Sequence, residues 1–139
     1  MPDDWEGGTI EDWVACKLVD SINRAKLTFS IFEGQNCHKD NEDCKDFKVY
    51  NKGQGYFEYR WGDPKDPKFK TPQAVAAPEY INLLFDWLDE QLADDAIFPQ
   101  TDDIDFPQDF IKKHASKMFT RYRRRTYLFV FPMKIRSSC

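Results

Sequence analysis

The pattern of apolar and polar positions along the chain predicts three helices, of which the central one is the clearest. In the stretch 77–99, apolar side chains recur every three or four residues and therefore share one stripe of a helix. A second stripe widens this apolar face, so we expect the helix at the centre of a bundle. The first stripe consists of Ile81, Leu84, Phe85, Leu88 and Leu92, and the second of Leu83 and Trp87.

Two further amphipathic helices flank the central one. Apolar residues recur at helical spacing from roughly Thr9 to Leu27, and Thr9 with Asp12 can form a capping box at the start. The third helix is predicted to open at Phe106-Pro107. Its apolar face contains Phe110, Ile111, His114, Met118, Phe119 and Tyr122. No motif places a nucleophile near His114, so a packed histidine is the better interpretation than a catalytic base.

An aromatic stretch between the first two helices predicts a β-hairpin. Tyr56 to Trp61 has the aromatic content of a strand, with Glu58 and Arg60 on one side. A turn follows at 62–67, and Lys68 to Thr71 is the predicted partner strand. Because a hairpin packed on a helix uses its rings as core more often than as a binding platform, we expect them in the core. The predicted fold is mainly α, a helical bundle with a small β-hairpin.

Composition indicates one folded domain. The 139 residues are enough for a single core, and 41% hydrophobic with 16% aromatic content excludes a disordered polymer. No apolar run approaches the roughly 20 residues of a membrane span. The N-terminus also lacks the basic start and apolar core of a signal peptide. We therefore expect a protein inside the cell, in the cytoplasm and also the nucleus, with no membrane partner.

The formal net charge of -4 is unevenly distributed. Acids crowd the connector 93–109, which lacks the alternating ligands, central glycine and closing glutamate of an EF-hand and is better interpreted as a solvated loop. Arginines crowd 121–125. Such a cluster can recognise phosphate through forked hydrogen bonds, or it can be a solvated basic helix end favoured by the dipole; both interpretations remain open.

Two cysteines are the candidate metal ligands. Cys37 and Cys44 lie in a polar loop with six residues between them, and thiolates at that spacing can supply two of four tetrahedral zinc ligands. His38 is adjacent to Cys37 and completes a site only if the loop bends unusually. Free or weakly metallated thiols are the alternative. The glycine-rich, zinc-protease and nucleophile-elbow motifs of common enzyme classes do not occur, so we expect no enzyme.

The central segment resembles the Mob (Mps-one-binder) family of kinase adaptors. The resemblance is carried by Ala77-Pro78-x-Tyr80-Ile81, Trp87, Gln91-Leu92 and Ile97-Phe98-Pro99, and by the aromatic sequence before the Gly62-Asp63 turn. It covers roughly residues 6–124. We therefore expect a single partial Mob-like domain over 1–139, with a divergent tail at 125–139 in place of the family's C-terminal helices.

The resemblance implies a kinase-binding face on the first helix. In Mob proteins an acidic helix with an exposed tryptophan docks a basic segment that precedes an NDR/LATS-type kinase domain. The matching residues are Glu6-Gly7, Glu11-Asp12-Trp13, Val19-Asp20 and Asn23. Gly8 stands where the family often has another acid. The implied function is a non-catalytic adaptor that regulates such kinases in Hippo or mitotic-exit-type signalling, with Glu11, Asp12, Trp13 and Asp20 as partner-binding residues.

The resemblance also implies two further sites. With a one-residue shift, Thr120-Arg121 and Arg124 match the motif that binds phosphothreonine peptides of MST/Hippo-type kinases, although Thr120 stands at the motif's first basic position. Arg121 and Arg124 are therefore the predicted phosphopeptide-binding residues. The family's zinc site adds two histidines from a later helix, but 121–133 contains none, which leaves Cys37 and Cys44 as an incomplete metal site.

Two alternatives to the kinase adaptor remain. One is phosphate or nucleic-acid binding through the 121–125 arginines and the aromatic hairpin, which the acidic net charge makes the weaker hypothesis for nucleic acid. The other is a truncated, non-functional Mob copy.

Overall fold

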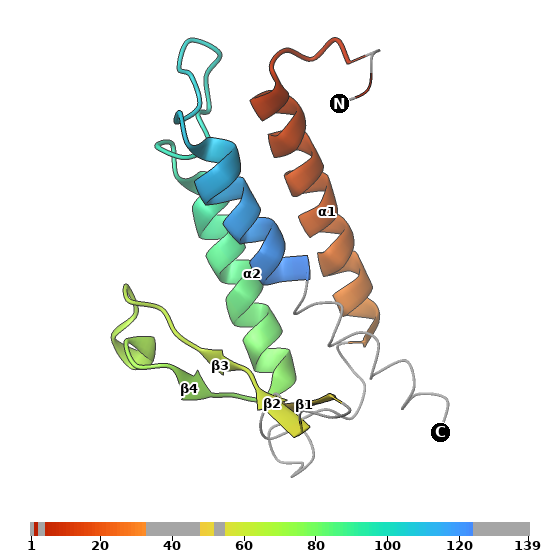
Figure 1. Ribbon diagram of the computed structural model, residues 1–139, viewed down its shortest axis with the longest axis vertical. Coiled ribbons are helices and arrows are strands. Elements are labelled where there is room, and N and C mark those ends of the chain that lie inside the picture. The colour runs from red at the N-terminus through yellow and green to blue at the C-terminus, as the bar shows by residue number, and fades with distance from the viewer. Residues whose placement is uncertain (1, 3–4, 33–47, 52–54, 124–139) are drawn as a thin grey trace.

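The fold is a small helical bundle with short strands at one end. A computed structural model describes residues 2, 5–32, 48–51 and 55–123. Its helical segments are α1 (Ile10–Phe32), α2 (Ala77–Ala93) and the segment 110–123. Figure 1 shows α1 and 110–123 running in one direction, α2 in the other, and the strands near the start of α2. The predicted mainly α class with a small hairpin is confirmed.

Helix α1 begins with the predicted capping box. The backbone N–H of Thr9 donates to the Asp12 carboxylate at 2.8 Å, and the N–H of Asp12 donates to the Thr9 hydroxyl at 3.3 Å. Toward the bundle α1 buries Leu18, Ile22 and Phe29. Because Phe29 follows Ile22 at the heptad spacing of this stripe, the helix continues to Phe32, beyond the predicted end at Leu27.

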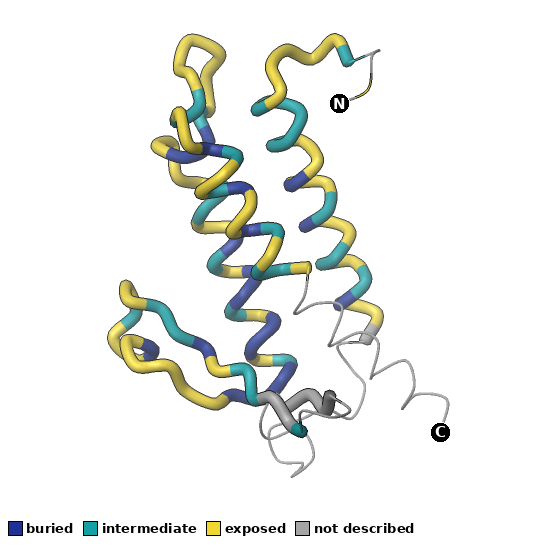
Figure 2. The backbone as a smooth tube through the Cα atoms, viewed as in Figure 1, coloured by how far each residue is buried: buried dark blue, intermediate teal, exposed yellow. Residues whose placement is uncertain are grey.

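Helix α2 forms the centre of the core, as its apolar periodicity predicted. Figure 2 shows buried positions on the sides of α1 and α2 that face each other. The ring of Phe29 meets that of Phe85 edge to face, with centroids 5.7 Å apart. At the surface the Lys26 ammonium lies 2.6 Å from the Asp89 carboxylate and joins the two helices. The fully buried residues of α2 are Ile81, Leu84 and Leu88.

In the described part of the chain, the strands form two separate antiparallel pairs. The predicted single strand 56–61 is divided: β2 (Gly55–Glu58) pairs with β1 (Lys48–Asn51), and β3 (Arg60–Trp61) pairs with β4 (Gln73–Ala74). Arg60 donates to Glu58 at 2.7 Å, so the two do share a side.

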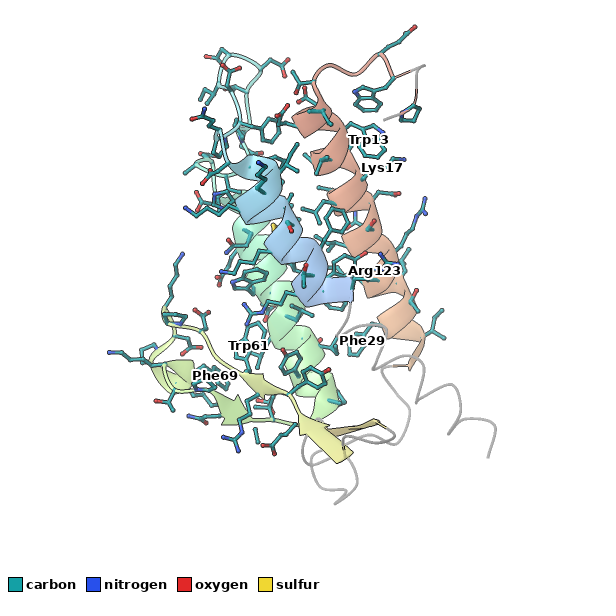
Figure 3. The ribbon with its side chains drawn as sticks, viewed as in Figure 1. Trp13, Lys17, Phe29, Trp61, Phe69 and Arg123 are labelled. Carbon is teal, nitrogen blue, oxygen red and sulfur yellow. The ribbon has the colours of Figure 1, made fainter. Side chains whose placement is uncertain are left out.

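The predicted partner strand Lys68 to Thr71 is wrong. Residues 67–69 form the 3-10 turn η2 (Pro67–Phe69), since the Asp66 side chain caps the N–H of Lys68 and proline occupies the first turn. The turn buries Phe69, and Trp61 is also buried, so both rings are core, as expected. Figure 3 shows Trp61 and Phe69 in this hairpin beside α2.

The third helix begins at Phe110 rather than at Phe106. Phe106 instead packs on Phe110, with ring centroids 4.5 Å apart, and the Phe110 N–H donates to the Pro107 carbonyl in a turn. Its first part is the π-helix η3 (Phe110–Ala115), and 116–123 continue as α-helix. A π-turn closes its hydrogen bonds one residue later than an α-turn. Each residue after it therefore takes the place that the preceding residue would have in an uninterrupted α-helix.

Within the described ranges, none of the helices is long and apolar enough to cross a membrane.

Candidate protein-binding surfaces

The outward face of α1 carries two of the four predicted partner-binding residues. Trp13 and Asp20 are seven positions apart and share a side of the helix, opposite the buried Leu18 and Ile22. Figure 3 shows Trp13 and its neighbour Lys17 on the side of α1 that faces away from α2. Trp13 is half-buried and Asp20 is exposed. We call Trp13, Lys17, Asp20 and Arg24 the outward face of α1.

This face carries cations as well as acids. The Lys17 ammonium lies over the Trp13 ring, 5.8 Å from its centroid, and Arg24 lies 3.0 Å from the Asp20 carboxylate. Sequence reasoning missed both cations. The signal was available, because each stands four positions after its partner, where helical side chains meet.

The other two predicted residues lie elsewhere on α1. Glu11 precedes Leu18 by seven positions, so it lies on the core-facing side of α1, half-buried, and not beside Trp13. The Asp12 carboxylate accepts from both the N–H and the hydroxyl of Thr9, each at 2.8 Å, and so is engaged in the capping box. The structure therefore places Trp13 and Asp20 on one face of α1, with Glu11 on the opposite side and Asp12 engaged at the start of the helix.

Gly8 has a structural reason for lacking a side chain. Its φ of +117° belongs to the region that residues with a Cβ rarely adopt, and an added Cβ would lie 2.6 Å from the Asp12 carboxylate. An acid at position 8 would be strained and would face a like charge. The capping arrangement at the start of α1 thus explains why position 8 carries no acid.

Arg121, a predicted phosphopeptide-binding residue, contacts two tryptophans. Its guanidinium carbon lies 4.3 Å from the centroid of the Trp61 ring and 4.5 Å from that of Trp87. One terminal nitrogen also donates to the Gly62 carbonyl at 3.3 Å. Arg121 therefore links the 110–123 helix to both α2 and the β3 strand, and its guanidinium is held in one orientation.

A lysine that sequence reasoning missed lies beside Arg121. Lys117, one helical turn earlier, places its ammonium 6.0 Å from the centroid of the same Trp87 ring. Thr120 and Arg123 are exposed. Arg124, the second predicted phosphopeptide-binding residue, lies outside the described residues.

The metal site cannot be placed. Cys37, His38 and Cys44 lie outside the described residues, so zinc binding stays a prediction. In the part of the chain that the structure does describe, no group of three or more His, Cys, Asp and Glu side chains is positioned to hold a metal ion. His114 is half-buried, with its Nε2 3.8 Å from the Asp109 carboxylate, which suits the packed role expected for it.

The acidic connector is solvated, as expected. Its aspartates at 94, 95, 102, 103 and 105 are exposed. A hydrogen bond from the Thr101 side chain, together with a backbone hydrogen bond at residue 103, lowers the pKa of Asp103 below its ordinary value. The same loop follows the end of α2, where Asp94 accepts from the N–H of Ala96 at 3.0 Å.

The fold and these surfaces define a mainly helical domain that presents a mixed-charge helix face and, elsewhere, a basic helix held on tryptophans. The Mob1/phocein family model matches residues 6–133, and the chain belongs to this family.

Relatives from animals and plants support the assignment. The chain is 40% identical over 111 residues to human (Homo sapiens) MOB kinase activator 3B, an alignment that covers 78% of this chain and 47% of that protein. It is 34% identical over 116 residues to bovine (Bos taurus) MOB kinase activator 3A, with 81% and 49% covered. It is 30% identical over 125 residues to Arabidopsis thaliana MOB kinase activator-like 2A, with 88% and 53% covered. The chain thus spans about half the length of the relatives it matches.

Proposed function

We propose that this chain is a non-catalytic adaptor that binds NDR/LATS-type kinases through the outward face of α1 and regulates their activation. The relatives' names describe kinase activators, and family membership makes a kinase the first partner to consider. The observation that carries the proposal is the placement of Trp13 and Asp20 on one side of α1, facing away from the bundle.

The chemistry of the face suits a basic helical segment. A half-buried indole offers a large apolar contact at low entropic cost, and tryptophan is among the residues that most often dominate binding energy. The exposed Asp20 carboxylate can orient a cation of the partner. Arg24 competes for that carboxylate, but an exposed ion pair at this spacing contributes only about 0.3–0.5 kcal/mol, so a partner cation can displace it.

The test is a calorimetric titration of the chain with the basic N-terminal segment of an NDR/LATS-type kinase. Asp20→Arg should weaken binding at least about tenfold, since like charges placed together at an interface cost several kcal/mol. Asp86→Arg, the same change at an exposed position of α2, is the matched control and should leave the affinity unchanged. Circular dichroism on each sample checks that helical content is retained. Equal affinities for Asp20→Arg and the control would contradict the assignment.

The contacts of Arg121 favour a second candidate function, the binding of phosphothreonine peptides of MST/Hippo-type kinases. A guanidinium held by two rings and a carbonyl has little freedom to lose when it binds a phosphate, which suits an anion-binding role. A phosphothreonine peptide from an MST-type kinase should bind the chain, and its unphosphorylated form should not. Equal binding of the two peptides would contradict this function.

A further inference from the structure

The ring of Trp87 lies next to two cations from one helix. Lys117 and Arg121 are four positions apart, so their side chains emerge on the same side of the 110–123 helix. Both approach the Trp87 indole, Arg121 at 4.5 Å and Lys117 at 6.0 Å from its centroid. Trp87 is half-buried on α2, so it is part of the bundle and still reachable from the surface.

Position 120 does not contribute a cation to this surface. The Mob resemblance places a basic residue there, but the chain has threonine. On an α-helix residue 120 lies about 100° around the axis from residue 121, whereas residue 117 lies almost directly above it. The structure thus offers the positive charge of Lys117, one helical turn before Arg121, in place of a basic residue at position 120.

We propose that Lys117 and Arg121, both held against Trp87, form the phosphate-binding site for a phosphothreonine side chain, and that Lys117 supplies the cation that Thr120 lacks. This inference rests on the proposed phosphopeptide-binding function and adds Lys117 as a ligand residue and Trp87 as a positioning residue.

The two cations have complementary chemistry toward a phosphate. Arginine presents a planar fork of donors that matches two phosphate oxygens, while the lysine ammonium is a compact charge on a flexible stem. A phosphothreonine carries between about -1.5 and -2 charge at neutral pH, which one cation does not balance. Trp87 attracts both cations through its ring face and so keeps each of them near the same indole before the ligand binds.

The inference is tested by fluorescence anisotropy with a labelled phosphothreonine peptide from an MST-type kinase and its unphosphorylated form. Lys117→Gln should weaken binding of the phosphorylated peptide by about fivefold or more, equivalent to about 1 kcal/mol. Lys112→Gln is the matched control, because Lys112 is an exposed lysine of the same helical segment and the charge change is identical. It should leave the affinity within about twofold.

Trp87 is tested with a conservative and a non-conservative variant. Trp87→Phe keeps an aromatic face and should retain most of the affinity, whereas Trp87→Leu should lose about as much as Lys117→Gln. In the Trp87→Leu background, adding Lys117→Gln should cost less than it does in the parent chain, because the ring no longer holds the lysine. A purely structural role of Trp87 would leave the cost of Lys117→Gln unchanged. Thermal unfolding of each variant confirms that it is folded.

The outcomes separate this inference from the function on which it rests. If the parent chain does not discriminate the phosphorylated peptide, the phosphopeptide function and the inference both fail. If the parent chain does discriminate it, the function stands. Under that result, equal affinities of Lys117→Gln and Lys112→Gln would overturn the inference alone. If Lys117→Gln weakens binding of the phosphorylated peptide as much in the Trp87→Leu background as in the parent chain, the role given to Trp87 is overturned.

Discussion

Replacing Arg121 by alanine is expected to lower the free energy of unfolding by about 4 kcal/mol. The change removes two cation–π contacts, to Trp61 at 4.3 Å and to Trp87 at 4.5 Å, each worth between about 0.5 and 2 kcal/mol depending on how dry the contact is. It also removes the hydrogen bond to the Gly62 carbonyl. Hydrogen bonds that involve a charged group contribute about 1.5–3 kcal/mol, and we take the low end, about 1.5 kcal/mol, because this one is 3.3 Å long. Trp61 is 2% exposed, so its contact lies toward the stronger limit.

The measurement is urea denaturation followed by circular dichroism, with two companion variants. Arg24→Ala is the control, because its ion pair with Asp20 joins side chains that are 77% and 50% exposed, and its loss should cost no more than about 0.5 kcal/mol. Arg121→Lys keeps the charge but not the planar group and should fall between the two. If Arg121→Ala and Arg24→Ala destabilise the chain equally, the tryptophan contacts do not hold the bundle together and the reasoning is refuted.

Two further predictions concern the start of α1 and the acidic connector. Thr9→Ala should cost about 1 kcal/mol of stability because it removes the cap of α1, and Thr9→Ser should restore most of it; a neutral effect of Thr9→Ala in urea denaturation would contradict the capping role. Thr101→Ala should raise the pKa of Asp103 toward its ordinary value, since the Thr101 side chain is the main cause that lowers it. The folded pKa is lowered, so the stability that Asp103 contributes is present above the ordinary pKa and is lost as the pH falls through the folded one. An NMR titration of the Asp103 carboxyl carbon measures the shift, and an unchanged midpoint would contradict its cause.

The helices could be predicted from the sequence because their signals are local. The stripe through Leu84 and Leu88 in α2, and the Thr9 cap of α1, depend on residues within a turn or two of one another. The hairpin partner depended on pairing across a turn. There a capped proline turn took the place of the predicted strand, and Gln73–Ala74 paired with β3 instead. The Phe106–Phe110 contact likewise moved the start of the third helix.

The candidate sites were predictable only in part. The spacing of Trp13 and Asp20 placed both on one face of α1. The environment of Arg121 was not accessible to sequence reasoning, because Trp61 and Gly62 are about sixty positions away along the chain and only the tertiary fold brings them to it. Lys117 was missed for the same reason. The roles of Cys37, Cys44 and Arg124 stay predictions, since all three lie outside the described residues.

The most direct test of the kinase-adaptor proposal is an NMR map of the chain's amide resonances during titration with the basic N-terminal segment of an NDR/LATS-type kinase. The outward face of α1 is predicted to contain the largest shift changes, at Trp13, Lys17, Asp20 and Arg24, with little change at the buried Leu18. Changes concentrated on 110–123 with α1 unaffected would contradict the proposal and would make the basic helix the partner-binding surface.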